Sequence, residues 1–385
     1  MDSVFSRGSG KMHSFFREST VKKLWFLSLF LLIFPVYLGH FPLPKAAKLL
    51  VYGSSALAYG FLLLKLFLWD GYQCRQIRLL LLALAILVLG TAASENRCFL
   101  SSFLLAASAK GISFRKISGF FFCFFLGALV LNLLLVALGV LEDAVTVRAE
   151  VWGNGNLRHS FGFGHPNTAA FWGMLFSCSA LLACPQSKRW HTMAVCLAFS
   201  LVLFRLTDSK AAFFSVLVAI FLMGCSIPLE RKLANWKWLA RVLPALMLLL
   251  TLGFLGLCLG YREGSGFFNL CNTLFSQRLA YGHQGFQRFG FSLFGKTVDF
   301  GWDPVDSLLC YAPICLGVLP SLVYLGASLW ALYRSSQAKR WDICALSLAG
   351  LLYCTMEYGL MNPVNLPLFA LCATLSPEEP RKLSV

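Results

Sequence analysis

Long uninterrupted apolar runs set the pattern of this chain, and its polar residues lie mostly in the segments between them. Most of the runs approach the roughly 20 helical residues that cross about 30 Å of hydrocarbon. They predict an all-α protein with about twelve transmembrane helices in a single domain, residues 24–375. The fourth and twelfth are short, as in tilted or re-entrant segments. The predicted spans are Leu24–Gly39, Ala47–Trp69, Leu79–Ala93, Cys98–Ala109, Ser118–Val140, Asn167–Cys184, His191–Arg205, Ser209–Ile227, Leu239–Gly260, Asp306–Tyr333, Trp341–Tyr358 and Pro363–Thr374.

Composition narrows the class of protein further. Hydrophobic residues make up 58% of the chain and charged residues 13%, whereas globular domains are nearer half apolar and a quarter charged. These values exclude a disordered chain, a secreted disulfide scaffold and an ordinary cytosolic enzyme, and they leave a polytopic membrane protein. Most of the 14 cysteines fall inside the predicted spans, so neither a disulfide framework nor a cysteine metal site is expected.

The excess of positive charge predicts the orientation. Of the 33 Lys and Arg residues, 21 fall in the segments expected on the cytoplasmic side, 11 in the outer segments and one, Lys65, within a span. Both termini are therefore expected in the cytoplasm, as a basic tail over residues 1–23 and a short tail over 376–385. The basic tail is interpreted as a topology anchor rather than a nucleic-acid site. Nothing resembles a cleaved signal peptide. The two longest outer loops are predicted at about 141–166 and 261–305.

Cations placed at outer helix ends need another explanation. Spans six, eight and ten run inward, so their amino termini face out, where free N–H groups and the helix dipole favour anions. We expect Asp208, Ser209 and Asp306 to suit helix caps there. The alternative is a set of ordinary turn residues with snorkelling cations. The candidate phosphate-binding cations are Arg158, Arg205, Lys210 and Arg278.

Several titratable residues share the expected outer face. A neutral histidine can act as a general base near pH 7, and His159, His165 and His283 are placed there. No histidine pair shows the i, i+4 spacing of a helical metal site, so a metal-free site is expected. Glu357 lies at the outer end of the eleventh predicted span, at the turn that leads to the last one, where a carboxylate is either functional or simply hydrated. Lys65, near the inner end of its span, is expected to snorkel.

Four short motifs, taken together, resemble the Wzy-type oligosaccharide repeat-unit polymerases of the O-antigen polymerase/ligase superfamily. The first is Arg158 followed by the run GFGHPN at 162–167, and the second is TDSK at 207–210, with Lys210 where arginine is usual. The third is SQRL at 276–279 followed by FG at 294–295, and the fourth is DS at 306–307 followed by Gly317. The resemblance extends over roughly residues 118–373.

The resemblance implies a GT-C-like membrane glycosyltransferase at the outer face of the bacterial cytoplasmic membrane, without cofactor or metal. Its substrates would be polyprenyl-pyrophosphate-linked oligosaccharides within the lipid bilayer, and it leaves room for a chain-length regulator as partner. Arg158, Arg205, Lys210 and Arg278 would stabilise the leaving pyrophosphate. His165 is the first choice of general base, with His283, Asp306 and Glu357 as alternatives, and Asn167 would orient sugar or phosphate.

Other functions remain open from the sequence alone. A ligase of the same superfamily would use the same residues. A lipid-linked oligosaccharide flippase or other transporter should place ionisable groups near mid-membrane, whereas the charges here gather at one face. A peptidoglycan polymerase of the shape–elongation type has a similar size, but its loop motifs are not found.

Overall fold

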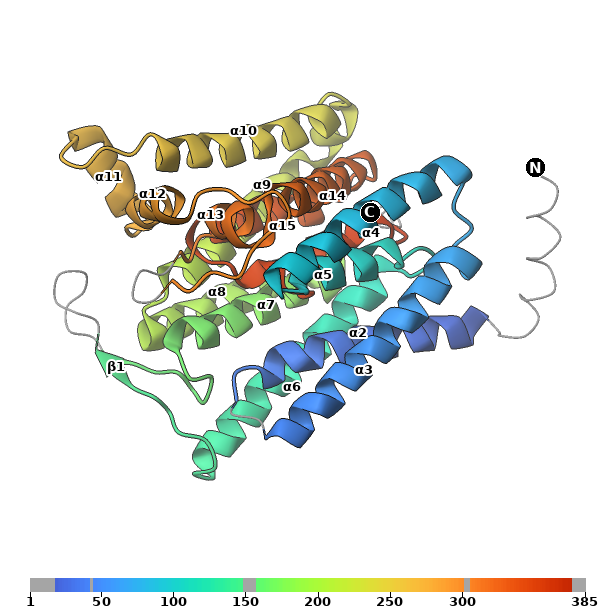
Figure 1. Ribbon diagram of the computed structural model, residues 1–385, viewed down its shortest axis with the longest axis horizontal. Helices are drawn as coiled ribbons and strands as arrows, with labels where there is room; N and C mark the ends of the chain where they lie inside the picture. The colour runs from blue at the N-terminus through green and yellow to red at the C-terminus, as the bar shows by residue number, and fades with distance from the viewer. Residues whose placement is uncertain (1–17, 42–43, 148–156, 301–304, 376–385) are drawn as a thin grey trace, which may run out of the picture.

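The chain folds as a bundle of helices in a computed structural model that describes residues 18–41, 44–147, 157–300 and 305–375 (Figure 1). The predicted tails, 1–23 and 376–385, lie largely outside the described residues. A small hairpin of β1 (Thr146–Val147) and β2 (Leu157–Arg158) lies at the same end of the bundle as α11 and α12. The α-helices are α2 (Glu18–Leu38), α3 (Lys45–Leu64), α4 (Cys74–Ser94), α5 (Cys98–Ala107), α6 (Phe114–Ala137), α7 (Pro166–Ala183), α8 (Arg189–Thr207), α9 (Lys210–Asn235), α10 (Leu239–Leu259), α11 (Gly266–Leu274), α12 (Arg278–Phe289), α13 (Leu308–Tyr311), α14 (Val318–Gln337) and α15 (Trp341–Met356).

Five shorter helical turns complete the described chain. The segment η1 (Lys65–Trp69) continues α3 as a π-helix, and η3 (Ala312–Leu316) joins α13 to α14 in the same conformation. The 3₁₀ turns are η2 (Gln186–Lys188), η4 (Gly359–Met361) and η5 (Leu366–Leu371).

Seven of the described helices are long and apolar enough to cross a membrane, judged by length and composition: α2, α3 with η1, α4, α6, α8, α9 and α10. They confirm an all-α protein of the membrane class, while the count of twelve spans stays a prediction. The structure differs from the prediction at the chain end, where the twelfth predicted span consists of turns and the 3₁₀ helix η5 rather than an α-helix. Pro363 and Pro367 in that segment lack the N–H donors that an α-helix needs.

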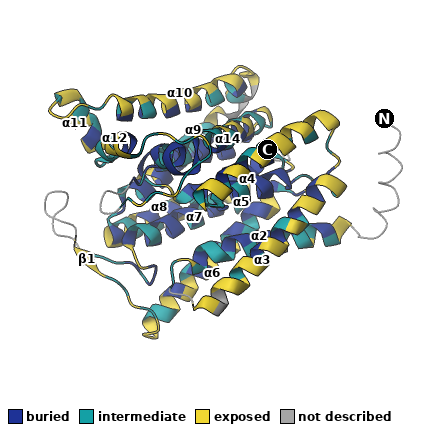
Figure 2. Cartoon of the chain, viewed as in Figure 1, coloured by how far each residue is buried: buried dark blue, intermediate teal, exposed yellow. Residues whose placement is uncertain are grey.

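The core and the outer surface of the bundle are both apolar. Buried aromatic side chains join α2, α6, α7 and η5: Trp25, Phe121, Phe125, Trp172 and Phe369. Figure 2 shows exposed residues along the outward faces of α3, α4 and α10, and many of these are leucines, such as Leu57, Leu79 and Leu249. An exposed apolar surface of this extent is typical of contact with lipid.

Two glycines close the large outer segment onto the bundle. Residues 290–296 run beside η3 and the start of α14, where the amide of Val318 donates to Ser292 O at 2.8 Å and that of Lys296 to Cys315 O at 2.9 Å. Gly317 has φ +100°, and a Cβ atom there would lie 2.4 Å from the backbone N of Gly295. Glycine is therefore required at 317 by both conformation and space.

Gly317→Ala should consequently cost at least about 2 kcal/mol of stability, because overpacking against backbone adds to an unfavourable φ. Gly326 is a matched control on the same helix, since a Cβ there would meet nothing within 4 Å. Gly326→Ala should be neutral or stabilising. Thermal unfolding of both purified variants in detergent checks this expectation, and equal midpoints would contradict it.

The expectation that Lys65 snorkels is wrong. Lys65 is 2% exposed, and its ammonium group donates to the Asp70 carboxylate, to Ser108 O at 2.6 Å and to Lys110 O at 3.0 Å. The reason is the π-helical turn η1, in which the Asp70 amide bonds to Lys65 O and brings residues five apart onto one face. Hydropathy does not reveal such a turn.

Lys65→Met should destabilise the protein by about 3–5 kcal/mol, because it leaves the buried Asp70 carboxylate without its cation. Lys65→Met combined with Asp70→Leu should recover most of that loss, since both charges are then gone. Lys22→Met, at an exposed helical pair with Glu18, should leave the unfolding midpoint unchanged. The expectation fails if the single and double variants unfold at the same temperature.

Candidate functional site

Asp143 organises the outer segment that carries the predicted GFGHPN motif. Its Oδ1 accepts from the amides of Ser160 at 2.8 Å and Phe161 at 2.7 Å, and its Oδ2 lies 2.6 Å from His159 Nδ1. Burial raises the pKa of Asp143, but the hydrogen bonds from His159 and the two amides outweigh it, so the pKa lies below its ordinary value. Sequence reasoning missed Asp143, because no spacing rule links it to residues 159–161.

His165 and Pro166 begin α7. His165 is the N-cap residue with extended backbone, and its Nδ1 accepts the amide N–H of Asn167 at 3.1 Å. Burial and the positive charge of Arg158 lower the pKa of His165, while Asp306 opposes the shift. The neutral ring therefore carries its proton on Nε2, which places it as a hydrogen-bond donor. Its expected role as first-choice base requires the other tautomer and stays a prediction.

Arg158 joins the ends of three helices. Its Nε donates to Thr207 O at 2.8 Å, at the end of α8, and a terminal guanidinium nitrogen donates to Asn167 Oδ1 at 2.6 Å, at the start of α7. The amide of Asn167 in turn donates to Glu357 Oε1 at 3.0 Å, just beyond α15. The side chains of Arg158, Asn167 and Glu357, which are far apart in the sequence, thus form one chain of hydrogen bonds.

Arg278 approaches Glu357 from the other side. It is the first residue of α12, and its Nε donates to Met356 O at 2.9 Å. One terminal nitrogen lies 2.8 Å from Asp306 Oδ2 and 3.3 Å from Glu357 Oε1. The expectation that Asp306 caps a helix is wrong. Ser307 is the N-cap of α13, and Asp306 pairs with Arg278 instead. We call Arg158, Asn167, Arg278, Asp306 and Glu357 the charged cluster.

The turn before α12 aims Arg278 at this cluster. Gln277 adopts a left-handed conformation with φ 69°, and its amide donates to Asn272 O at 2.8 Å. The side chain of the buried Asn272 accepts from the amide of Ala280 at 3.1 Å, which fixes the first turn of α12. Asn272 was not predicted as a site residue, and its role is visible only once α11 and α12 lie side by side.

Glu357 is the central carboxylate of the charged cluster. Its side chain is 16% exposed, and burial raises its pKa to about 7, with the Arg278 charge lowering it and the Asp306 charge raising it. Oε1 accepts from both Asn167 and Arg278, whereas Oε2 makes no hydrogen bond within the described part of the chain. One oxygen is thus fixed in place and the other is left to take a proton.

Three predicted site residues lie apart from the charged cluster. Arg205, in the last turn of α8, and Lys210, at the start of α9, form neither a hydrogen bond nor an ion pair with the residues that the structure describes. They flank Thr207, whose carbonyl holds Arg158. Asp208, expected to start a helix, is the C-cap of α8 with φ 47°, and Ser209 is the N-cap of α9. His283 packs its ring on Tyr261 and pairs Nδ1 with Cys258 O at 3.0 Å.

Within residues 18–41, 44–147, 157–300 and 305–375, no group of three or more His, Cys, Asp or Glu side chains could hold a metal ion. The expected metal-free site stays a prediction. Chemically, the cluster offers two guanidinium groups, a partly buried carboxylate of pKa about 7 and a second carboxylate, all beside helix ends. Such a set can bind an anion and accept a proton.

No protein-family model, no curated protein and no solved structure matches this chain. The family resemblance therefore stays a prediction from its motifs.

Proposed function

We propose that this protein is a membrane glycosyltransferase that polymerises polyprenyl-pyrophosphate-linked oligosaccharide repeat units, without metal or cofactor. The observation that carries the proposal is Glu357, a partly buried carboxylate held between Asn167 and Arg278 at one end of an apolar helix bundle. The hairpin end of the bundle would face outward from the bacterial cytoplasmic membrane, as the distribution of Lys and Arg predicts.

The reaction assigns each member of the cluster a role. A sugar hydroxyl of the acceptor attacks the anomeric carbon of the donor glycan, and the carbon–oxygen bond to the lipid pyrophosphate breaks. Glu357 Oε2 takes the proton of the attacking hydroxyl, for which a pKa of about 7 is well matched. Asn167 and Arg278 hold the other carboxylate oxygen, and Asp306 anchors Arg278.

The leaving pyrophosphate needs positive charge as the bond breaks. Arg158 and Arg278 supply it within the cluster, although the two carboxylates partly offset them. Arg205 and Lys210 add further cations beside Thr207, and the amino termini of α7 and α9 add oriented N–H groups. His165 Nε2–H would donate to a phosphate or sugar oxygen. Among the candidate bases, Glu357 is therefore favoured over His165.

The ligase alternative uses the same cluster and differs only in its acceptor. The transporter alternative is less well supported, because the cluster lies at helix ends rather than in the middle of the bundle.

Incubation of the purified protein with a lipid-linked repeat unit tests the proposal. We expect a ladder of polymers on a gel, formed equally well with a metal chelator present. Loss of the ladder with chelator would overturn the metal-free mechanism. Absence of any longer product under all conditions would overturn the polymerase.

A further inference from the structure

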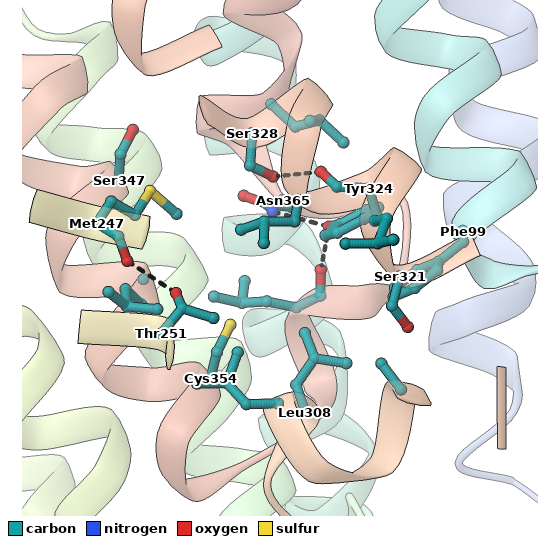
Figure 3. Close-up of a pocket in the computed structure, with 18 of the residues that line it drawn as sticks. Phe99, Met247, Thr251, Leu308, Ser321, Tyr324, Ser328, Ser347, Cys354 and Asn365 are labelled. Carbon is teal, nitrogen blue, oxygen red and sulfur yellow. Dashed lines mark hydrogen bonds between the residues drawn. The ribbon is translucent and has the colours of Figure 1, made fainter. Parts of the chain in front are cut away.

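A cavity of about 260 Å³ lies between α10, α14, α15 and the segment from η4 to η5, and Figure 3 shows side chains that line it. Its wall includes Phe99, Met247, Leu308 and Cys354, and Phe99 stacks on Tyr324 with ring centroids 4.2 Å apart. An apolar cavity of about 150 Å³ already accepts a benzene-sized molecule. This larger one can take a segment of a branched hydrocarbon chain.

The polar groups that line the cavity are already paired. Tyr324 donates its hydroxyl to Leu360 O at 2.8 Å and accepts from Asn365 Nδ2 at 2.8 Å, as Figure 3 shows. The lining hydroxyls each donate to a carbonyl one turn earlier in their own helix, as in Thr251, Ser321, Ser328 and Ser347. A polar ligand would find few partners here, whereas an apolar chain would lose none.

The position of the cavity links it to the charged cluster. Cys354 lies in the last turn of α15, three residues before Glu357, and its carbonyl accepts from Ser307 Oγ at 3.1 Å. Leu308 and Leu309 follow Asp306 along the chain and also line the cavity. Two of the cluster's carboxylates, Asp306 and Glu357, thus lie within three residues of side chains that line the cavity.

Part of the cavity wall reaches the exposed apolar surface of the bundle. Three of its lining residues are large, apolar and more than half exposed, namely Leu252 on α10, Phe291, and Leu322 on α14, at 55%, 55% and 57%. They continue the exposed apolar face of α10, which includes Leu249 at 67%. A chain can therefore enter from the bilayer between α10 and α14 without crossing water.

We propose that this cavity binds the part of the polyprenyl chain nearest the pyrophosphate of the lipid-linked substrate, entering between α10 and α14. The inference rests on the proposed function and adds the site at which the polyprenyl chain of the substrate binds. Hydrocarbon in the cavity sets the pyrophosphate one helical turn away, at Arg278 and Glu357. The bound polyprenyl chain also covers the side of the charged cluster that faces the cavity, and so keeps water from the reacting anomeric carbon.

Binding of radiolabelled geranylgeranyl pyrophosphate to the purified full-length protein in detergent tests the site. Ser347→Phe fills the cavity, and Leu322→Trp narrows its mouth at an exposed position where folding is not at risk. Excluding even two methylene groups should weaken binding about tenfold. Leu249→Trp, on the lipid-facing side of α10 outside the cavity, should bind the probe as the wild type does.

Two results would overturn this inference. One is unchanged affinity in both Ser347→Phe and Leu322→Trp, with thermal unfolding showing that both are folded. The other is displacement of the probe by dioleoyl phosphatidylglycerol as effective as by unlabelled geranylgeranyl pyrophosphate, which would make the cavity a site for bulk lipid. Because the probe can bind without any glycosyl transfer, this test is independent of polymer formation. If the protein forms polymer and neither substitution changes the affinity for the probe, the proposed lipid-chain site is refuted and the proposed polymerase activity is not.

Discussion

Glu357→Gln is expected to slow glycosidic-bond formation by about 10²–10⁴-fold, the usual contribution of a positioned general base. Glutamine keeps the size of the side chain and an oxygen for the bonds from Asn167 and Arg278, but it cannot take the proton. Initial rates of polymer formation by the purified protein, at saturating lipid-linked repeat, measure the effect. Glu263→Gln, at an exposed position after α10, serves as the matched control and should retain the wild-type rate.

The pH dependence gives a second readout of the same variant. Because burial raises the pKa of Glu357 to about 7, the wild-type rate should increase about tenfold per unit up to that pH and level off above it. A raised carboxyl pKa contributes stability below the unfolded value of about 4.3, and that stability is lost as the pH rises through 7. Glu357→Gln should therefore unfold at the same or a higher temperature than the wild type at pH 8. A wild-type rate in the variant, or the same pH profile, would remove Glu357 from the mechanism.

Arg278→Ala is expected to reduce the turnover rate by about 10²–10³-fold, comparable to removal of one donor that stabilises developing charge. The loss has two parts: the leaving pyrophosphate loses a cation, and Asp306 and Glu357 lose the group that neutralises them. The pKa of Glu357 should then increase, because Arg278 lowers it in the wild type. The pH profile of the residual activity should shift to higher pH accordingly.

Arg278→Lys separates charge from geometry. Lysine restores a point charge but not the fork that reaches Met356 O and both carboxylates, so only part of the activity should return. Arg288→Ala, at an exposed position on the same helix, should retain the wild-type rate. If Arg278→Ala and Arg288→Ala reduce the rate equally, the special position of Arg278 is refuted.

The spanning helices could be predicted from the sequence, because a bilayer demands a certain length and hydropathy of each. Apolar runs such as Phe114–Ala137 predict spanning helices because length and hydropathy alone decide them. Deviations arise from local backbone chemistry, as in the turns around Pro363 and Pro367. The buried pair of Lys65 and Asp70 depends on a π-helical turn that no periodicity announces.

The sequence predicted the residues of the charged cluster in the candidate site but not the contacts between them. Arg158, Arg278, Asp306 and Glu357 were selected because they flank apolar runs on one predicted face, and Asn167 because of the family resemblance. The structure brings all five together. Their pairing could not be predicted, because Arg278 and Glu357 are 79 residues apart in the chain. The same contacts show that the two arginines are partly neutralised. We propose Glu357 rather than His165 as the base, because His165 Nδ1 already accepts from the Asn167 amide, whereas both printed bonds to Glu357 use Oε1.

The most direct measurement of the central claim is the release of polyprenyl pyrophosphate by the purified protein in liposomes supplied with lipid-linked repeat units. The proposed function predicts one free polyprenyl pyrophosphate for each new glycosidic bond, and neither product with Glu357→Gln. Movement of intact lipid-linked repeats across the bilayer, with no polyprenyl pyrophosphate released, would contradict it.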